Sequence, residues 1–317
     1  MNPVDADTGD GEPPVGEKHL RQWRELLTRL NVTLQEPHAS GLETSIRGIA
    51  SDLAALVQAD PDMAQALLVH PELCEPYPYS VAHSAHVAAT WALLALRQDG
   101  AAPESLTVPL CAALTMNLAM LSLQDRLADQ EAPPKPAQRD LLREHPVQSA
   151  AMLRHSGITE PLWLAMVEQH HEEPGGGGYP ARLPEPLPEA QRLRMIDVYC
   201  ACFGSRARRH PMLPDLAARR LFQQHATDPT ALALAKEFGL YPPGTVVRLA
   251  SLELALVVRR GAAANAPIAI ALQNPNGEPR ATPAQRDTSQ PAFAVVAAVT
   301  PALLRVRIPW VQLFTLY

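Results

Sequence analysis

Aromatic residues are scarce in this sequence: Phe, Trp and Tyr make up 5% of 317 residues, while hydrophobic residues as a whole make up 47%. The core must therefore consist mainly of Ala, Leu and Val, which suits closely packed helices better than a β-sandwich. No apolar run reaches the roughly 18 residues of a membrane span, and the acidic, polar start is unlike a signal peptide. We therefore expect a cytoplasmic protein with no membrane span.

Positive charge and cysteine are also in short supply. The formal net charge is -6, which argues against a general binder of nucleic acid polymers. Only four cysteines occur, and all lie in apolar, helix-like contexts: Cys74, Cys111, Cys200 and Cys202. We expect them to be reduced thiols. The C-x-C pair is too small a cluster to indicate a metal site.

The composition changes along the chain and predicts four segments. Residues 1–16 hold Pro, Gly and Asp with few large apolar side chains, so we expect a disordered tail. Residues 17–75 predict an N-terminal helical module, and 76–226 predict a larger helical domain. Residues 227–317 predict a C-terminal extension with a β-rich segment. The fold class is therefore mainly α.

Apolar residues at i, i+3 and i+4 spacing predict the individual helices. In the N-terminal module Leu20, Trp23 and Leu26 begin one helical face, and further helices are expected over 42–57 and 62–69. In the larger domain the expected helices are 80–98, 106–128, 137–155, 160–171, 189–205 and 213–226. After a short helix, Val- and Leu-rich runs bounded by turn residues predict strands within 241–261, 266–277 and 292–308.

Five polar residues stand out because they lie on or beside these apolar helices: His83, His145, His170, His171 and Asp197. A lone histidine is usually an exposed residue or a hydrogen-bonded core residue. A buried carboxylate such as Asp197 is costly unless it is paired or bound to a metal. Imidazole and carboxylate together suit Zn, Mn or Fe, so the set predicts a metal site.

Five segments resemble a known family, in their sequence and in their order along the chain. The strongest is "HHEEPGGGGYP" at 170–180, which is similar to H-H-E-x-x-D-G-x-G-Y-P. "YSVAHSAHVA", "REHPVQSAAML" and "RMIDVYCAC" match three further segments, and "GLYPPGTVVRLASLELALVV" resembles the part that follows. The sequence is thereby identified as a member of the HD-GYP family, whose members cleave cyclic di-GMP. The resemblance covers residues 77 to about 258 and implies an HD-type helical bundle.

The resemblance fails at the adjacent His-Asp pair after which the family is partly named. The segment similar to A-A-L-L-H-D-I-G-K reads "AALTMNLAM", so Met116 stands for the histidine, Asn117 for the aspartate and Met120 for the lysine. Gly175 and Cys200 replace two further aspartates. Tyr79 stands where some members carry an additional metal-binding glutamate. Five changes around one site suggest that hydrolytic activity has been lost, so we assign no catalytic residue.

In the family, the missing aspartate bridges two metal ions. The first ion would use His83 and Asp197 with the absent His-Asp pair, and the second would use His145, His170 and His171. An amide is a weak ligand and a thioether suits softer ions, so we expect at most one divalent metal (Fe, Mn or Zn). The three histidines of the second site are its predicted ligands, with His83 and Asp197 as further candidates. The alternative is that the histidines pack without a metal.

Two further features of the family could bind a ligand or a partner. Gly178, Tyr179 and Pro180 keep the GYP loop, which is either a partner-contact surface or a flexible turn. Arg206 and Arg209 match family positions that face the phosphates of the ligand, and guanidinium groups pair well with phosphate. The alternative for these arginines is a solvated helix end.

Two functions follow from these observations. The first is a degenerate signalling module, impaired in catalysis, that binds cyclic di-GMP or a signalling partner protein. The second is a metal-dependent cyclic di-GMP phosphodiesterase that works with a single metal.

Overall fold

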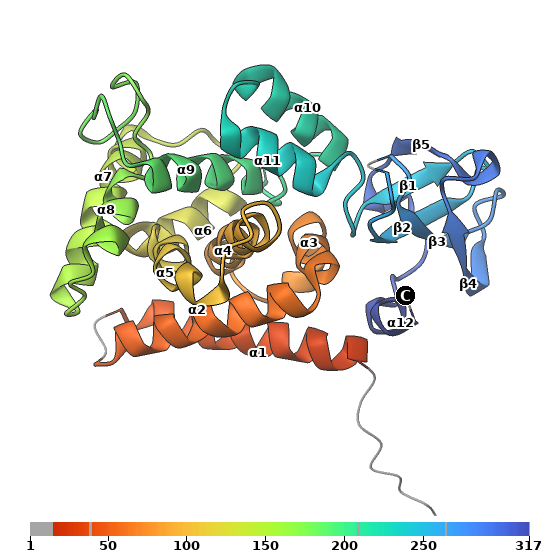
Figure 1. Cartoon of the computed structure of the whole chain (residues 1–317), viewed down its shortest axis with the longest axis horizontal. Helices are drawn as coiled ribbons and strands as arrows, with labels where there is room; N and C mark the ends of the chain where they lie inside the picture. Colours follow the sequence, from red (N-terminus) through yellow and green to blue (C-terminus); the bar gives the residue numbers. More distant parts are fainter. Residues whose placement is uncertain (1–14, 38–39, 208–209, 264, 317) are drawn as a thin grey trace, which may run out of the picture.

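The computed structural model describes residues 15–37, 40–207, 210–263 and 265–316. Most of the expected tail, residues 1–14, lies outside this part of the chain. Val15 and Gly16 already belong to the first helix, so the predicted end of the tail at residue 16 is too late. The fold is mainly α, as the sequence predicted, with a small antiparallel sheet at one end (Figure 1).

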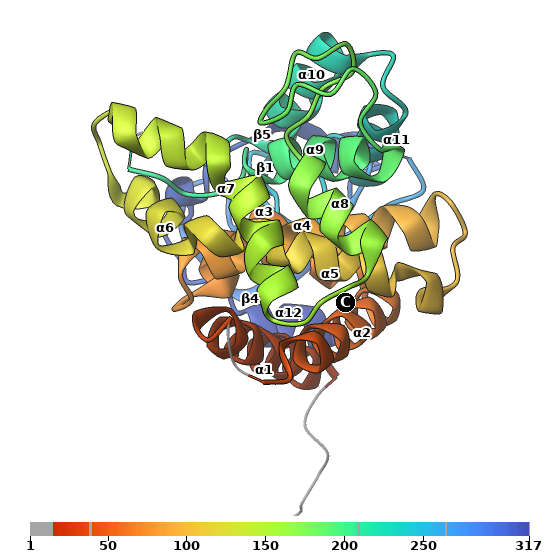
Figure 2. The same cartoon turned by 90° about the vertical axis from the view of Figure 1, so that its left-hand side faces the viewer.

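The chain begins with three helices: α1 (Val15–Gln35), α2 (Leu42–Ala59) and α3 (Pro61–Val69). Helices α1 and α2 lie beneath the central helices in both views (Figures 1 and 2). Their apolar faces join the same hydrophobic core as the central helices, in which Trp23, Leu53 and Trp163 are all buried. The N-terminal helices therefore share their core with the larger domain. Its predicted limits at residues 76 and 226 stay a prediction.

The central region is a bundle of α-helices connected by turns and by longer loops, such as residues 170–187 between α8 and α9. The helices are α4 (Tyr79–Arg97), α5 (Thr107–Thr115), α6 (Leu121–Asp129), α7 (Pro136–His155), α8 (Pro161–Gln169), α9 (Pro188–Cys200), α10 (Pro214–His225) and α11 (Pro229–Phe238). A proline opens each helix from α7 to α11. Proline suits this position because its fixed φ is helical and its missing N–H has no partner there. All four cysteines are buried, and none of them forms a disulfide bond.

The predicted helix 106–128 is wrong, because the chain breaks between α5 and α6. Asn117 and Met120 have φ/ψ angles of -102/14° and -126/13°, and a short 3₁₀ turn spans Leu118–Met120. The backbone N–H of Ala119 donates to Ser149 Oγ on α7 at 3.0 Å. This contact between helices replaces a hydrogen bond along the helix, and the break turns Asn117 toward a cavity. The predicted helix 189–205 likewise ends early, at Cys200.

The C-terminal extension forms a five-stranded antiparallel sheet in the order β4-β3-β2-β1-β5. The strands are β1 (Val246–Leu249), β2 (Leu254–Arg259), β3 (Ile268–Gln273), β4 (Pro279–Asp287) and β5 (Val295–Ala298). Alternate residues of β1 enter different apolar clusters, Val246 on one face and Val247 on the other. The sequence did not predict β4 or the last helix, α12 (Trp310–Leu316), which packs against α1.

One stretch is long and apolar enough to cross a membrane by length and composition, which the sequence analysis did not expect. It runs from Pro103 to Asp129, and 67% of its most apolar window is buried inside the protein. This stretch contains α5, the break and α6, so it supplies core residues and one wall of the cavity described next.

Candidate metal and ligand site

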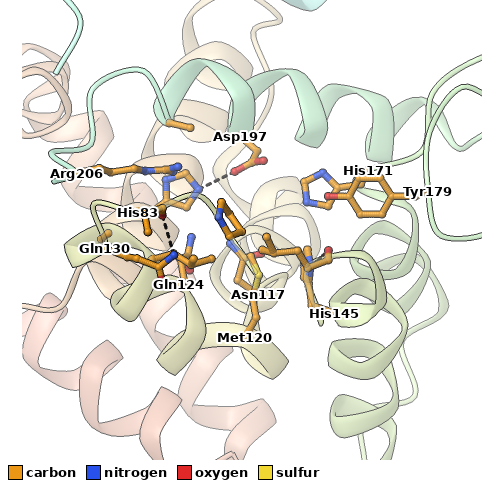
Figure 3. A pocket seen from close by; sticks show the side chains of 16 residues that line it. His83, Asn117, Met120, Gln124, Gln130, His145, His171, Tyr179, Asp197 and Arg206 are labelled. Atoms are coloured by element: carbon orange, nitrogen blue, oxygen red, sulfur yellow. Dashed lines mark hydrogen bonds and ion pairs between the residues drawn. The ribbon is translucent and has the colours of Figure 1, made fainter. Parts of the chain in front are cut away.

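A cavity of about 550 Å³ opens between α4, the α5–α6 break, α7, α9 and the loop after α8. Figure 3 shows Arg206 and His83 at one end, His171 and Tyr179 at the other, and Asn117 with Gln124 below Asp197. Its size is within the ordinary range for small-molecule sites. The cavity therefore brings together most of the residues that the sequence singled out.

Three histidines form a compact cluster at one end of the cavity. His145 comes from α7, and His170 and His171 directly follow α8. Their ligand nitrogens all lie within 4.8 Å of one another. His145 and His170 are 1% and 0% exposed. Burial lowers the pKa of His145 to about 3, and it also lowers the pKa values of His170 and His171. All three imidazoles are therefore neutral at pH 7, the form that binds metals.

The hydrogen bonds of two of these rings fix which nitrogen carries the proton. His145 Nδ1 lies 2.8 Å from the carbonyl of Leu142, and His170 Nδ1 lies 2.7 Å from that of Val167. A carbonyl only accepts, so each Nδ1 must donate. Both Nε2 atoms then carry lone pairs, yet they face each other at 3.1 Å. Two neutral rings cannot hydrogen-bond in this way, so the arrangement calls for a cation between them.

The cluster therefore fits a divalent metal. Ring nitrogens that bind metals commonly have the opposite N–H anchored to a backbone carbonyl, as His145 and His170 do. Neutral imidazole suits Zn, Fe and Mn. The sequence prediction that these three histidines lie together is matched by their geometry.

The other two predicted ligands, His83 and Asp197, bond to each other. His83 Nε2 on α4 lies 2.6 Å from Asp197 Oδ1 on α9, as the dashed line in Figure 3 marks. Burial alone would raise the pKa of Asp197, but His83, His171 and His170 outweigh it and hold the pKa well below its usual value. Asp197 is therefore ionised and 14% exposed. The pair lines the cavity but does not belong to the three-histidine cluster.

The two residues at the position of the expected His-Asp pair, Met116 and Asn117, lie in different surroundings. Met116 is fully buried in the hydrophobic core, while Asn117 is 2% exposed and lines the cavity. Within the described part of the chain, Asn117 Oδ1 has no hydrogen-bond partner. Cys200 is also buried, and its thiol contacts Thr90 Oγ1 at 3.4 Å. Neither Met116 nor Cys200 supplies an atom to the histidine cluster.

Arg206 reaches the cavity and is held there by Tyr79. Its Nε lies 3.2 Å from Tyr79 Oη, and its guanidinium carbon lies 4.9 Å from the centre of the Tyr79 ring. Tyr79 in turn stacks on His83, with ring centres 5.6 Å apart. The other predicted phosphate-binding residue, Arg209, lies outside the described residues. Arg206 therefore gives the cavity one fixed positive charge.

The GYP loop is built by glycine conformations and one buried carboxylate. Gly175 and Gly176 have φ angles of 79° and 78°, which other residues adopt with strain. Glu172 is 0% exposed and accepts hydrogen bonds from backbone N–H groups of the same loop. Tyr179 stacks on His171 with ring centres 4.7 Å apart. The loop is thereby fixed against the histidine cluster.

Two side chains of the site were missed by the sequence analysis. Glu172 was part of the quoted motif, but its role in bonding the loop depends on backbone positions that the motif does not give. Gln124 on α6 lines the cavity, is 8% exposed, and its Oε1 has no partner among the described residues. No motif contains Gln124. A polar residue in an otherwise apolar position of α6 was the one available signal.

Two known proteins are similar to this chain, one in sequence and one in fold. No protein-family model matches the chain. It is 27% identical over 237 residues to a cyclic di-GMP phosphodiesterase of Pseudomonas aeruginosa, a match that covers 73% of this chain and 54% of that protein. The chain thus spans about half the length of this relative.

A solved structure of an HDG"Y"P protein from Bdellovibrio bacteriovorus has the same fold. The two structures superpose with a TM-score of 0.56 at 16% identity, covering 73% of this chain and 74% of the other. The structure from Bdellovibrio bacteriovorus shows the fold, and the ordered histidine segments, the intact GYP loop and the similarity to the Pseudomonas protein support one identification: a member of the HD-GYP family.

Proposed function

We propose that this protein is a signalling member of the HD-GYP family that binds cyclic di-GMP, or a partner protein, without hydrolysing the phosphodiester. The observation that carries the proposal is Asn117, a neutral amide at the place where the family has its bridging carboxylate. The proposed ligand comes from the relative in Pseudomonas aeruginosa, which is named for that substrate.

The proposed loss of hydrolysis is supported by the residues that the cavity retains. A two-metal phosphodiesterase holds the attacking and leaving oxygens between two ions. Here His83 and Asp197 bond to each other, and Met116 is enclosed in the core. Within the described ranges of the chain, only the half formed by His145, His170 and His171 keeps three ligands close together. The first ion would therefore have no adequate set of ligands, and the clamp on the phosphate would be missing.

The proposed metal content is one divalent ion of Fe, Mn or Zn, held by the three histidines. When bound, such an ion supplies positive charge that attracts an anionic ligand. Arg206, held by Tyr79, adds a second positive charge. These two charges support the binding of a phosphate-bearing ligand even where no bond is broken.

The proposed binding face consists of Gly178, Tyr179, Pro180 and Arg206. Tyr179 and Arg206 both line the cavity, at opposite ends (Figure 3). Tyr179→Ala combined with Arg206→Ala should weaken binding of cyclic di-GMP at least tenfold, because it removes one charge-assisted contact and one aromatic surface. The melting temperature should change little. Unchanged binding, measured by calorimetry, would contradict the proposed face.

The second function, a phosphodiesterase with a single metal, is favoured by one observation: the histidine cluster opens onto a cavity large enough for a ligand. Turnover by the wild type separates the two functions, and the double variant Met116→His with Asn117→Asp tests whether the site derives from a two-metal centre. If the site is a degenerate two-metal centre, this variant should bind more metal than the wild type. If the wild type already turns over cyclic di-GMP with one ion, the single-metal enzyme is correct.

A further inference from the structure

Two amide oxygens in the cavity lack hydrogen-bond donors. Asn117 Oδ1 and Gln124 Oε1 are both buried, and neither has a partner among the residues that the structure describes. Their side chains are 2% and 8% exposed and line the same cavity as the histidines and Arg206. A buried acceptor without a donor costs about 1–3 kcal/mol, and such groups in native proteins call for an explanation.

The rest of the cavity offers a different kind of interaction. Arg206 is a donor that attracts anions, and the histidine cluster fits a cation that would do the same. A ligand that only accepts hydrogen bonds, such as sulfate, would satisfy these groups and leave both amide oxygens unpaired. A ligand that satisfies the whole cavity must carry N–H or O–H donors beside its phosphates.

The side-chain amide of Gln130 also lines the cavity, but both its nitrogen and its oxygen have hydrogen-bond partners. Its Nε2 donates to the carbonyl of Ala132 at 2.8 Å, and its Oε1 accepts from Gln138 Nε2 at 3.0 Å. Gln130 therefore supports the loop before α7. Gln124 and Asn117 also line the cavity, but their buried oxygens have no partner among the described residues.

We infer that Gln124, together with Asn117, accepts hydrogen bonds from the base of a bound guanine nucleotide. This inference rests on the proposed function, since it names the part of the ligand that these residues recognise. The edge of guanine carries two adjacent donor groups, N1–H and the 2-amino group, whereas adenine presents one amino group beside a ring acceptor. Two unpaired acceptors therefore favour guanine over adenine.

The test uses Gln124→Met, which conserves volume and removes the acceptor. Binding of cyclic di-GMP to the full chain should weaken on the order of tenfold, because a base donor is left unpaired. The urea midpoint without ligand should stay equal or rise, because an unsatisfied polar atom leaves the interior. A residue with a purely structural role would lower that midpoint. Gln130→Met is the matched control and should lower the midpoint, since it breaks bonds within the loop.

Selectivity gives a second readout. The wild type should bind cyclic di-GMP more tightly than its hypoxanthine analogue, which lacks the 2-amino group, and more tightly than cyclic di-AMP. Gln124→Met should reduce these differences. Equal loss of affinity for all three ligands, or no loss at all, would overturn the assignment of Gln124 while leaving the proposed function intact. A wild type that binds none of the three would overturn both this inference and the proposed binding of cyclic di-GMP, and would leave a partner protein as the proposed ligand.

Discussion

The opposed lone pairs of His145 and His170 predict that a divalent metal stabilises this protein. Their Nε2 atoms lie 3.1 Å apart with both Nδ1 protons committed to backbone carbonyls. An ion between them replaces a repulsive contact by two coordinate bonds, and the ion binds the folded state alone. At a free metal concentration of about 100 times Kd, this linkage adds about 2.7 kcal/mol to the free energy of unfolding. For a chain of this size the melting temperature should rise by about 5 °C.

The assay is a thermal melt of the metal-stripped protein with added Mn²⁺, Fe²⁺ or Zn²⁺, followed by elemental analysis. His145→Ala should abolish the shift. His155→Ala is the matched control, because His155 is an exposed histidine at the end of the same helix α7, and it should keep the full shift. The reasoning is refuted if His145→Ala shifts as much as the wild type, or if two ions bind per chain.

Two further predictions concern the loop and the acid range. Gly178→Ala should lower the free energy of unfolding by about 1–3 kcal/mol and weaken metal binding, because the new Cβ would collide with backbone atoms of His171 and Glu173. Urea denaturation measures the change in stability. Gly177→Ala is the control, because its Cβ would meet only the Glu173 side chain. Burial lowers the pKa of His86 from its usual 6.5 to about 3 in the folded protein. The unfolded chain therefore binds a proton more readily than the folded one, so this histidine lowers the free energy of unfolding progressively as the pH falls from 6.5 toward 3. Between pH 7 and pH 5, His86→Leu should therefore lose about 2 kcal/mol less stability than the wild type; equal losses would show that His86 is not buried in its neutral form.

The histidine cluster was predictable because its geometry is largely local. Adjacent His170 and His171 follow one helix, and His145 lies on the preceding one, so a short connection brings them together. The bond between His83 and Asp197 was not predictable. Sequence reasoning placed both as metal ligands, and only their distance in space shows that they bond to each other.

Other misses have a common physical cause, which is contact between distant parts of the chain. The helix around Asn117 breaks because Ala119 bonds to Ser149, and no local residue there signals an end. Strand β4 contains two prolines and few large apolar residues, so it does not resemble a strand. It forms at the sheet edge by pairing with β3 alone. Helix α12 packs against Gly16 at the opposite end of the chain.

The central claim is tested most directly by measuring whether cyclic di-GMP stays intact when the protein binds it. The metal-loaded wild type is incubated with cyclic di-GMP, and the bound and free nucleotides are separated by chromatography. The account predicts that intact cyclic di-GMP is recovered from the bound fraction, with no linear dinucleotide formed. Formation of linear dinucleotide over many turnovers, abolished by His170→Ala, would contradict it and identify the protein as an active phosphodiesterase.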